Sequence, residues 1–212
     1  MGTIVVQVFK SPRRLESLHH KTMRIIAGEF RSRPILAPKQ DTTRPITDRV
    51  KQSLFDIIAP QIEDARVYDL FAGTGSMGLE CLSRGAAHAN FFESDRSAIE
   101  RLKKNIAALK LESRSQIIPG DLFKWFSSNA PANKANLIFL DPPYRFLKEH
   151  AQKLRNLTEF LATNHLAGDG WVIFRHDVED ALELPRLKVV DRREYGGMVL
   201  EFLRCNGFCT GP

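Results

Sequence analysis

Short apolar runs alternate with amphipathic segments through most of the chain, and this alternation is typical of parallel βαβ units. Strands are predicted where a short apolar run stands between turn-forming residues, and helices where apolar residues recur every three or four positions. The predicted strands are Arg66–Phe71, His88–Glu93, Ser115–Ile118, Asn136–Leu140 and Trp171–Arg175. The predicted helices between them are Ser76–Arg84, Asp95–Lys110, Leu122–Ser127 and Phe146–Thr163.

The last part of the chain departs from a plain dinucleotide-binding pattern. Residues 188–204 predict two strands joined by the turn Tyr195-Gly196-Gly197, which adds a hairpin with one antiparallel strand. The run Asn136–Leu140 is nearly all apolar, so we expect it at the centre of the sheet. The predicted fold is α/β and Rossmann-like, with seven mostly parallel strands and helices on both faces.

A smaller element precedes this alternation. The runs Arg24–Ala27 and Pro34–Ala37 predict a β-hairpin, and a helix is predicted over Arg49–Ile58 with Thr47 or Asp48 as its N-cap. Its apolar positions fall on one stripe: Val50, Leu54, Ile57 and Ile58. We expect this helix to pack on the main sheet and to join the hairpin to it.

The chain length of 212 residues and its 43% hydrophobic content suit one domain. We predict that residues 23–204 form this domain, with 23–48 as the hairpin and loop attachment, 1–22 as a flexible extension and 205–212 as a tail. No apolar run approaches the ~18 residues of a membrane span. We therefore expect a cytoplasmic protein without membrane contact, and a monomer. No metal site is expected, because Cys205 and Cys209 lack the second ligand pair of a structural metal site.

The net charge of +6 is concentrated near the N-terminus. Residues 1–51 hold eleven Lys/Arg and four Asp/Glu, a net of +7, and the remainder is close to neutral. Such an asymmetry favours binding of a polyanion; a solvated arm kept for solubility is the alternative. Guanidinium groups pair with phosphates and stack on unpaired bases, so RNA contacts are predicted for Arg24, Arg31, Arg33 and Arg44.

A glycine-rich turn follows the first long strand, and its sequence runs from Asp69 to Gly78. The glycines permit a tight turn and close approach of a ligand, but Gly73, Gly75 and Gly78 also satisfy the dinucleotide pattern, with Glu93 as a possible ribose partner. Asp69 favours a cation at the turn over a pyrophosphate. Together with Asp141 it suits S-adenosylmethionine, which carries a sulfonium and an ammonium group.

Four acids are predicted at successive strand ends, where open α/β folds bind ligands: Asp69, Glu93, Asp121 and Asp141. Glu93 can accept hydrogen bonds from both ribose hydroxyls. Asp121 is placed to accept from the adenine amino group, with the Leu122 backbone nearby. Asp69 favours the ammonium group, directly or through water. Phe71, Gly73 and Gly75 complete the predicted cofactor site.

The sequence Asp141-Pro142-Pro143-Tyr144 predicts a site for an exocyclic amino group of a base. That nitrogen is a poor nucleophile because its lone pair is delocalised into the ring. One Asp141 oxygen and the Pro142 carbonyl can hold its two N–H bonds, and the carboxylate stabilises the positive charge that develops during transfer. Tyr144 offers a face for stacking. The target base must be extruded or unpaired to reach such a site.

At these residues the sequence resembles the bacterial 16S ribosomal RNA (guanine(966)-N(2))-methyltransferases over about Met23 to Arg204. The most specific stretches are Met23–Gly28, Thr43–Lys51, Asp69–Gly75 and Asp141–Tyr144. The resemblance implies a class I S-adenosylmethionine-dependent methyltransferase fold and methylation of one guanine in small-subunit RNA within a ribosomal particle. It also implies that Arg44–Asp48 lies near the active site.

Three other functions remain open from the residues alone. A DNA or RNA adenine-N6 methyltransferase shares the Asp-Pro-Pro-Tyr motif, although no separate target-recognition domain is visible. The glycine pattern leaves an NAD-dependent oxidoreductase possible, and the basic hairpin leaves a non-catalytic RNA-binding module.

Overall fold

A computed structural model describes residues 23–38, 46–129 and 133–206 of the protein. A seven-stranded sheet with the order β5-β4-β3-β6-β7-β9-β8 forms its centre, and only β9 runs antiparallel to its neighbours. The strands are β3 (Arg66–Leu70), β4 (His88–Glu93), β5 (Ser115–Pro119), β6 (Ala135–Leu140), β7 (Leu166–Asp177), β8 (Leu187–Tyr195) and β9 (Met198–Cys205). This confirms the predicted fold.

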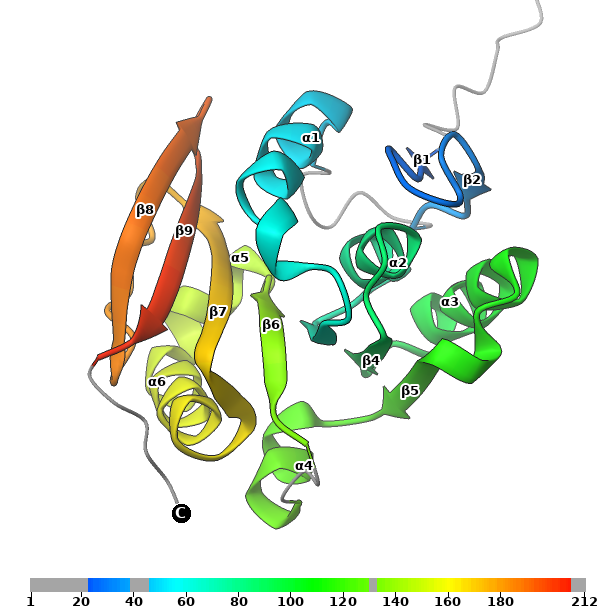
Figure 1. Ribbon diagram of the computed structural model, residues 1–212. Helices are drawn as coiled ribbons and strands as arrows, with labels where there is room; N and C mark the ends of the chain where they lie inside the picture. The colour runs from blue at the N-terminus through cyan, green and yellow to red at the C-terminus, as the bar shows by residue number, and fades with distance from the viewer. Residues whose placement is uncertain (1–22, 39–45, 130–132, 207–212) are drawn as a thin grey trace, which may run out of the picture.

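Helices cover both faces of the sheet (Figure 1). One face carries α1 (Asp48–Ile57), α2 (Ser76–Ser83) and α3 (Arg96–Leu109), and the other carries α4 (Leu122–Ser128), α5 (Tyr144–Glu149) and α6 (Ala151–Phe160). Short 3-10 turns occupy Ala59–Gln61 and Glu112–Arg114, and a π-helical turn spans Leu161–His165. Because both faces are covered, the central strands are apolar at consecutive positions and not only at alternate ones.

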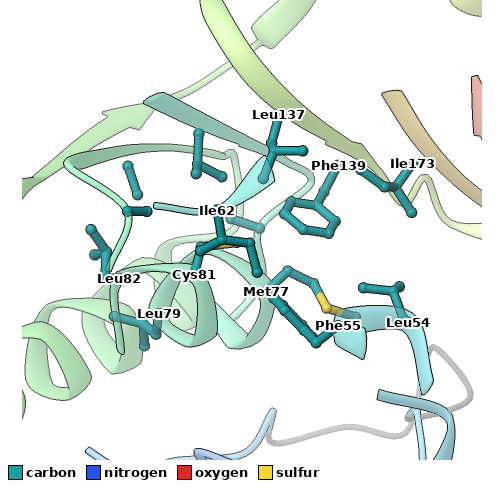
Figure 2. Packing of buried hydrophobic residues seen from close by; sticks show 14 of the residues in the cluster. Leu54, Phe55, Ile62, Met77, Leu79, Cys81, Leu82, Leu137, Phe139 and Ile173 are labelled. Atoms are coloured by element: carbon teal, nitrogen blue, oxygen red, sulfur yellow. The ribbon is translucent and has the colours of Figure 1, made fainter. Parts of the chain in front are cut away.

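The side chains of β6 show how one strand serves two cores. Phe139 packs in the cluster under α1 and α2, whereas its neighbours Ile138 and Leu140 pack in the cluster under α4 to α6. The Phe139 ring centroid lies 6.0 Å from that of Phe55 in α1, and Figure 2 shows both rings beside Met77 of α2. Consecutive strand residues point to opposite faces, so the apolar run of β6 fills both layers.

Two predicted elements differ from the observed ones. The helix expected at Phe146–Thr163 is divided at His150, which has non-helical backbone angles (φ −133°, ψ 27°). No Gly or Pro signals this break; the Phe146 and His150 rings pack edge to face, with centroids 4.7 Å apart. The strand expected at Trp171–Arg175 begins earlier, because β7 includes the stretch 167–170 as a bulge between the Leu166 and Trp171 pairings with β6.

The N-terminal hairpin is present but small. β1 (Met23–Arg24) pairs with β2 (Pro34–Ile35) in antiparallel register. Helix α1 begins at the predicted cap, where the Thr47 hydroxyl accepts from the Val50 amide at 3.3 Å. At the other end of the domain, Cys205 was assigned to the tail; it is instead the buried last residue of β9, and its thiol donates to the Ala162 carbonyl at 3.7 Å. Residues 1–22 and 207–212 lie outside the described residues.

Candidate active site

A cavity of about 320 Å³ opens where β3, β4 and β5 end. These are the carboxyl ends of parallel strands, and the direction of strand order reverses between β3 and β6, which is the usual ligand site in such sheets. The lining residues come from the loops after these strands and from α4 to α6: Phe71, Phe92, Glu93, Ser94, Gly120, Asp121, Leu122, Phe123, Phe146, His150 and Lys153. Four predicted cofactor residues are therefore brought together here: Phe71, Glu93, Asp121 and Leu122.

Backbone amides hold the two carboxylates of this cavity in fixed orientations. Glu93 Oε2 accepts from the Gly73 amide at 2.7 Å, and its Oε1 accepts from the amides of Ser94 at 2.7 Å and Asp95 at 2.8 Å. Asp121 caps α4, where its Oδ1 accepts from the amides of Phe123 and Lys124. Glu93 thus joins the glycine turn to the next strand end, and Glu93 Oε2 and Asp121 Oδ2 keep lone-pair capacity for a ligand hydroxyl or amine.

Three aromatic rings form the apolar wall of the cavity. The rings of Phe123 and Phe146 are nearly parallel, at 7°, with centroids 6.3 Å apart, and Phe71 meets both edge-on. Phe71 has a φ of +58°, a strained conformation for a bulky residue that is typical of functional sites. Phe123 and Phe146 were not predicted, because they come from two separate helices, α4 and α5, and neither belongs to a motif.

Gly73 and Gly75 are glycines for different structural reasons. Gly73 has a φ of +56° and open space where a Cβ would stand, so a ligand could approach it closely. Gly75 has a φ of +83°, but its Cβ would lie 2.4 Å from the Leu102 side chain. Gly75 is therefore required because α3 packs against it, and its predicted contact with a cofactor stays a prediction.

Asp69 does not stand at the mouth of the turn. It lies inside β3, paired in register with Phe139 of β6, and is 2% exposed beneath α2. Its Oδ2 accepts from the Gly78 amide at 2.9 Å. Burial is the main cause that raises the pKa of Asp69 to about 8; the negative charges of Asp141 and Glu93 add to the shift, and the Gly78 amide and Lys51 oppose it. Asp69 thus anchors α2 from below, and its contact with a cofactor ammonium, directly or through water, stays a prediction.

This pKa predicts a specific dependence of stability on pH. An unfolded Asp69 loses its proton near its ordinary pKa of 3.8, and the folded one near a pKa of about 8, so between these values the folded state holds the extra proton. The free energy of unfolding must then fall as the pH rises. Relative to Asp69→Asn, the wild-type protein is expected to lose stability from about pH 4 to pH 8 and to level off above it. Urea denaturation of both proteins across this range measures the difference; parallel curves would contradict it.

Asp141 follows β6 at the same edge of the sheet, and its side chain is 25% exposed. Its Oδ1 accepts from Arg175 Nε at 2.7 Å. Pro142 is buried, and Pro143 is the N-cap of α5, whose first residue is Tyr144. The position of the Tyr144 side chain is outside what the structure describes. Asp141 is near enough to Asp69 for its charge to affect the Asp69 pKa, although neither lines the 320 Å³ cavity.

Comparison with known proteins identifies the family. Residues 23–204 match the family model described as conserved hypothetical protein 95. The chain is 34% identical over 178 residues to ribosomal RNA small subunit methyltransferase D of Escherichia coli, covering 84% of this chain and 86% of that protein. The chain belongs to this methyltransferase family. It is also 36% identical over 181 residues to the putative rRNA methyltransferase YlbH of Bacillus subtilis, covering 83% of this chain and 95% of that protein.

Solved structures of similar proteins agree with the family assignment. The putative methyltransferase yhhF of Escherichia coli superposes with a TM-score of 0.76 at 31% identity, over 87% of this chain and 98% of that one. A putative methylase of Haemophilus influenzae gives a TM-score of 0.67 at 28% identity, over 87% and 98% of the two chains. The fold is thus that of the class I methyltransferases.

In this family member, a buried carboxylate ties the hairpin to the catalytic domain. Glu80 of α2 is fully buried and accepts from the amides of Ile26 and Ala27 at 2.8 and 2.9 Å. It also pairs with Lys51 of α1 at 2.9 Å and Arg84 at 2.8 Å. Helix α1 was predicted to join the hairpin to the sheet. Glu80 was not predicted, because in sequence it is an ordinary helix residue.

A second connection runs from the hairpin to the glycine turn. Asn105 of α3 accepts from the Leu36 amide at 2.7 Å, and its Nδ2 donates to the carbonyls of Leu36 and Thr74. Lys51 also donates to Ser76, the first residue of α2. The hairpin is therefore built into the wall that carries the cofactor turn.

The predicted RNA-contact residues lie on the outside of this hairpin. Arg24, Arg31 and Arg33 are exposed, and Arg24 pairs with Asp48 at 2.8 Å. Arg24, Arg31 and Arg49 contribute to the lining of a second cavity, of about 340 Å³, between the hairpin and the start of α1. Arg44 lies outside the described residues.

The described residues contain no group of three or more His, Cys, Asp or Glu side chains placed to hold a metal ion. Of their helices, none combines the length and apolar character needed to cross a membrane.

Proposed function

We propose that the protein uses S-adenosylmethionine to methylate the exocyclic N2 amino group of one guanine in small-subunit ribosomal RNA. The observation that carries this proposal is the placement of Asp141-Pro142-Pro143-Tyr144 directly after β6, beside the cavity that holds Glu93 and Asp121. The names of the Escherichia coli and Bacillus subtilis relatives, both ribosomal RNA methyltransferases, support the RNA substrate.

The residues of the 320 Å³ cavity fit the nucleoside part of this cofactor. Glu93 accepts from ribose hydroxyls and Asp121 from the adenine amino group, while Phe71, Phe123 and Phe146 offer apolar surface to the purine. The open space at Gly73 leaves room for the methionine part. When bound, S-adenosylmethionine supplies an electrophilic methyl group on a sulfonium.

Asp141 and Pro142 prepare the guanine amino group for attack. One Asp141 oxygen and the Pro142 carbonyl accept its two N–H bonds, which turns the nitrogen lone pair toward the methyl donor. The carboxylate charge then stabilises the positive charge that develops on the nitrogen. Because the prolines fix φ and β6 fixes the start of the motif, both acceptors are held before the base arrives, which provides much of the benefit of proximity.

Product analysis tests this function directly. Purified protein, labelled S-adenosylmethionine and small-subunit ribosomal RNA or particles should give N2-methylguanine at one nucleotide. N6-methyladenine as the product would replace the proposal with the adenine alternative. Calorimetry with S-adenosylhomocysteine and NADH separates the remaining alternatives: binding of NADH alone would support an oxidoreductase, and binding of neither would support a non-catalytic RNA-binding module.

Charge reversal on the hairpin is expected to weaken RNA binding. Arg31→Glu combined with Arg33→Glu removes two exposed guanidinium groups, so the affinity should fall and the slope of log K against log salt should decrease in magnitude by about 1 to 2. Lys188→Glu with Arg186→Glu is the matched control, since both side chains are exposed and lie at the start of β8, the outer strand on the other side of the sheet from the α2 and α3 contacts of the hairpin. Equal losses in the two double variants would argue against a hairpin contact.

A further inference from the structure

Arg175 is a buried cation placed against the carboxylate of the Asp-Pro-Pro-Tyr motif. Strands β6 and β7 are parallel neighbours, with Leu140 paired to Phe174, so Asp141 and Arg175 occupy the next position of the same register. Arg175 is 7% exposed, and its Nε donates to Asp141 Oδ1 at 2.7 Å. A buried ion pair of this kind requires a reason, since burying the guanidinium is costly unless it is well paired.

The guanidinium is held from a second side. Arg175 Nη1 lies 3.8 Å from the sulfur of Met198, at the start of β9, and β9 is the other neighbour of β7. Arg175 therefore contacts Asp141, which directly follows β6, and Met198 of β9, on either side of its own strand. Because these strands are hydrogen-bonded to one another, the position of Nε relative to Asp141 is fixed by the sheet.

A carboxylate has two oxygens, and the hydrogen bond from Arg175 Nε goes to Oδ1. This hydrogen bond sets the rotation of the Asp141 side chain and therefore the direction of Oδ2. We propose that Arg175 is a positioning residue of the methyl transfer: it orients Asp141 so that Oδ2 meets the amino group of the target base. This inference rests on the proposed function.

The need for a cation follows from the groups around Asp141. Asp69 of β3 and Glu93 of β4 are acids at the same edge of the sheet as Asp141, and Lys51 of α1 is a nearby cation. The charges of Asp141, Glu93 and Lys51 all affect the pKa of Asp69, so these groups lie within electrostatic range of one another. Neighbouring acids disfavour a further negative charge. Arg175 provides the opposing charge in direct contact with Asp141.

Two substitutions test the role. In Arg175→Met, kcat for methyl transfer at pH 7 should fall by about 10- to 100-fold, as expected for a misplaced acceptor, while the Kd for S-adenosylhomocysteine and the KM for RNA change less than about twofold. Arg175→Lys retains the charge but not the Nε geometry, so it should restore only part of kcat.

Arg114→Met controls for the loss of an internal guanidinium, because Arg114 donates to the carbonyls of Leu82 and Ala86 away from Asp141. It should lower the melting temperature and leave kcat close to that of the wild type. An Arg175→Met protein that binds S-adenosylhomocysteine normally and keeps the wild-type kcat would overturn the inference. If the wild-type protein itself transferred no methyl group to the RNA, the proposed function would fail instead.

Discussion

Replacing Asp141 with asparagine is expected to lower the kcat of methyl transfer by about 10²- to 10³-fold, the usual cost of removing one electrostatic contact to a transition state. Asparagine keeps the shape of the side chain but removes the charge that stabilises the developing positive nitrogen. Its amide also cannot reproduce the ionic contact with Arg175, whose Nε lies 2.7 Å from the native Oδ1. Single-turnover rates with labelled S-adenosylmethionine and small-subunit RNA measure the effect.

Binding of S-adenosylhomocysteine to Asp141→Asn should be close to that of the wild type, because Asp141 is not among the residues that line the 320 Å³ cavity. Asp169→Asn, in the bulge of β7, is the matched control and should leave the rate unchanged. A wild-type rate in Asp141→Asn would remove the assigned role, whereas a loss confined to cofactor affinity would move Asp141 from the target-base site to the cofactor site.

The second large effect is expected on stability. Glu80→Ala should lower the free energy of unfolding by about 3–5 kcal/mol, the range for removing one member of a buried ion pair. The substitution leaves the buried Lys51 ammonium without its carboxylate and the amides of Ile26 and Ala27 without their acceptor. Burial lowers the pKa of Lys51, and the charge of Glu80 opposes that shift, so Lys51 should lose its proton more readily in the variant.

Urea denaturation of three proteins separates the causes of this loss. Glu80→Ala with Lys51→Met should be more stable than Glu80→Ala alone, because the second change removes the unpaired buried charge. Glu100→Ala, which removes the partner of Lys103 on an exposed helix surface, should change stability little. If Glu80→Ala were as stable as Glu100→Ala, the buried network would not hold the hairpin on α2, and RNA binding should be retained as well.

Some elements of the fold were predictable because their signals are local. The strand β4 has the predicted bounds, His88–Glu93, and β6 differs by one residue, since continuous apolar runs between turn residues have few alternatives in an α/β chain. Thr47 was one of two predicted caps of α1, and it is the observed one, because a short polar side chain can satisfy the first amides of a helix from within the same segment.

Other features depended on distant residues and left no local signal. The break at His150 contains no helix-breaking residue, and the ring of Phe146 packs against it. Asp69 was predicted to line the ligand crevice at a strand end, whereas the structure buries it beneath α2, in register with Phe139. Successive strand residues point to opposite faces, and the cover over each face comes from helices elsewhere in the chain, so the depth of Asp69 has no local signal.

The sequence by itself determined the order of strands and helices, the basic hairpin, and the candidate chemistry of the glycine turn and of Asp141-Pro142-Pro143-Tyr144. Each of these is encoded in a contiguous stretch, where periodicity, turn residues and motif spacing are sufficient. Only the tertiary structure decided that Arg175 meets Asp141, that Phe123 and Phe146 face each other, and that Glu80 holds the hairpin. These partners lie far apart in the chain, and they meet because the packing of the sheet and its two helical layers fixes strand register and helix rotation, which no single stretch of sequence specifies.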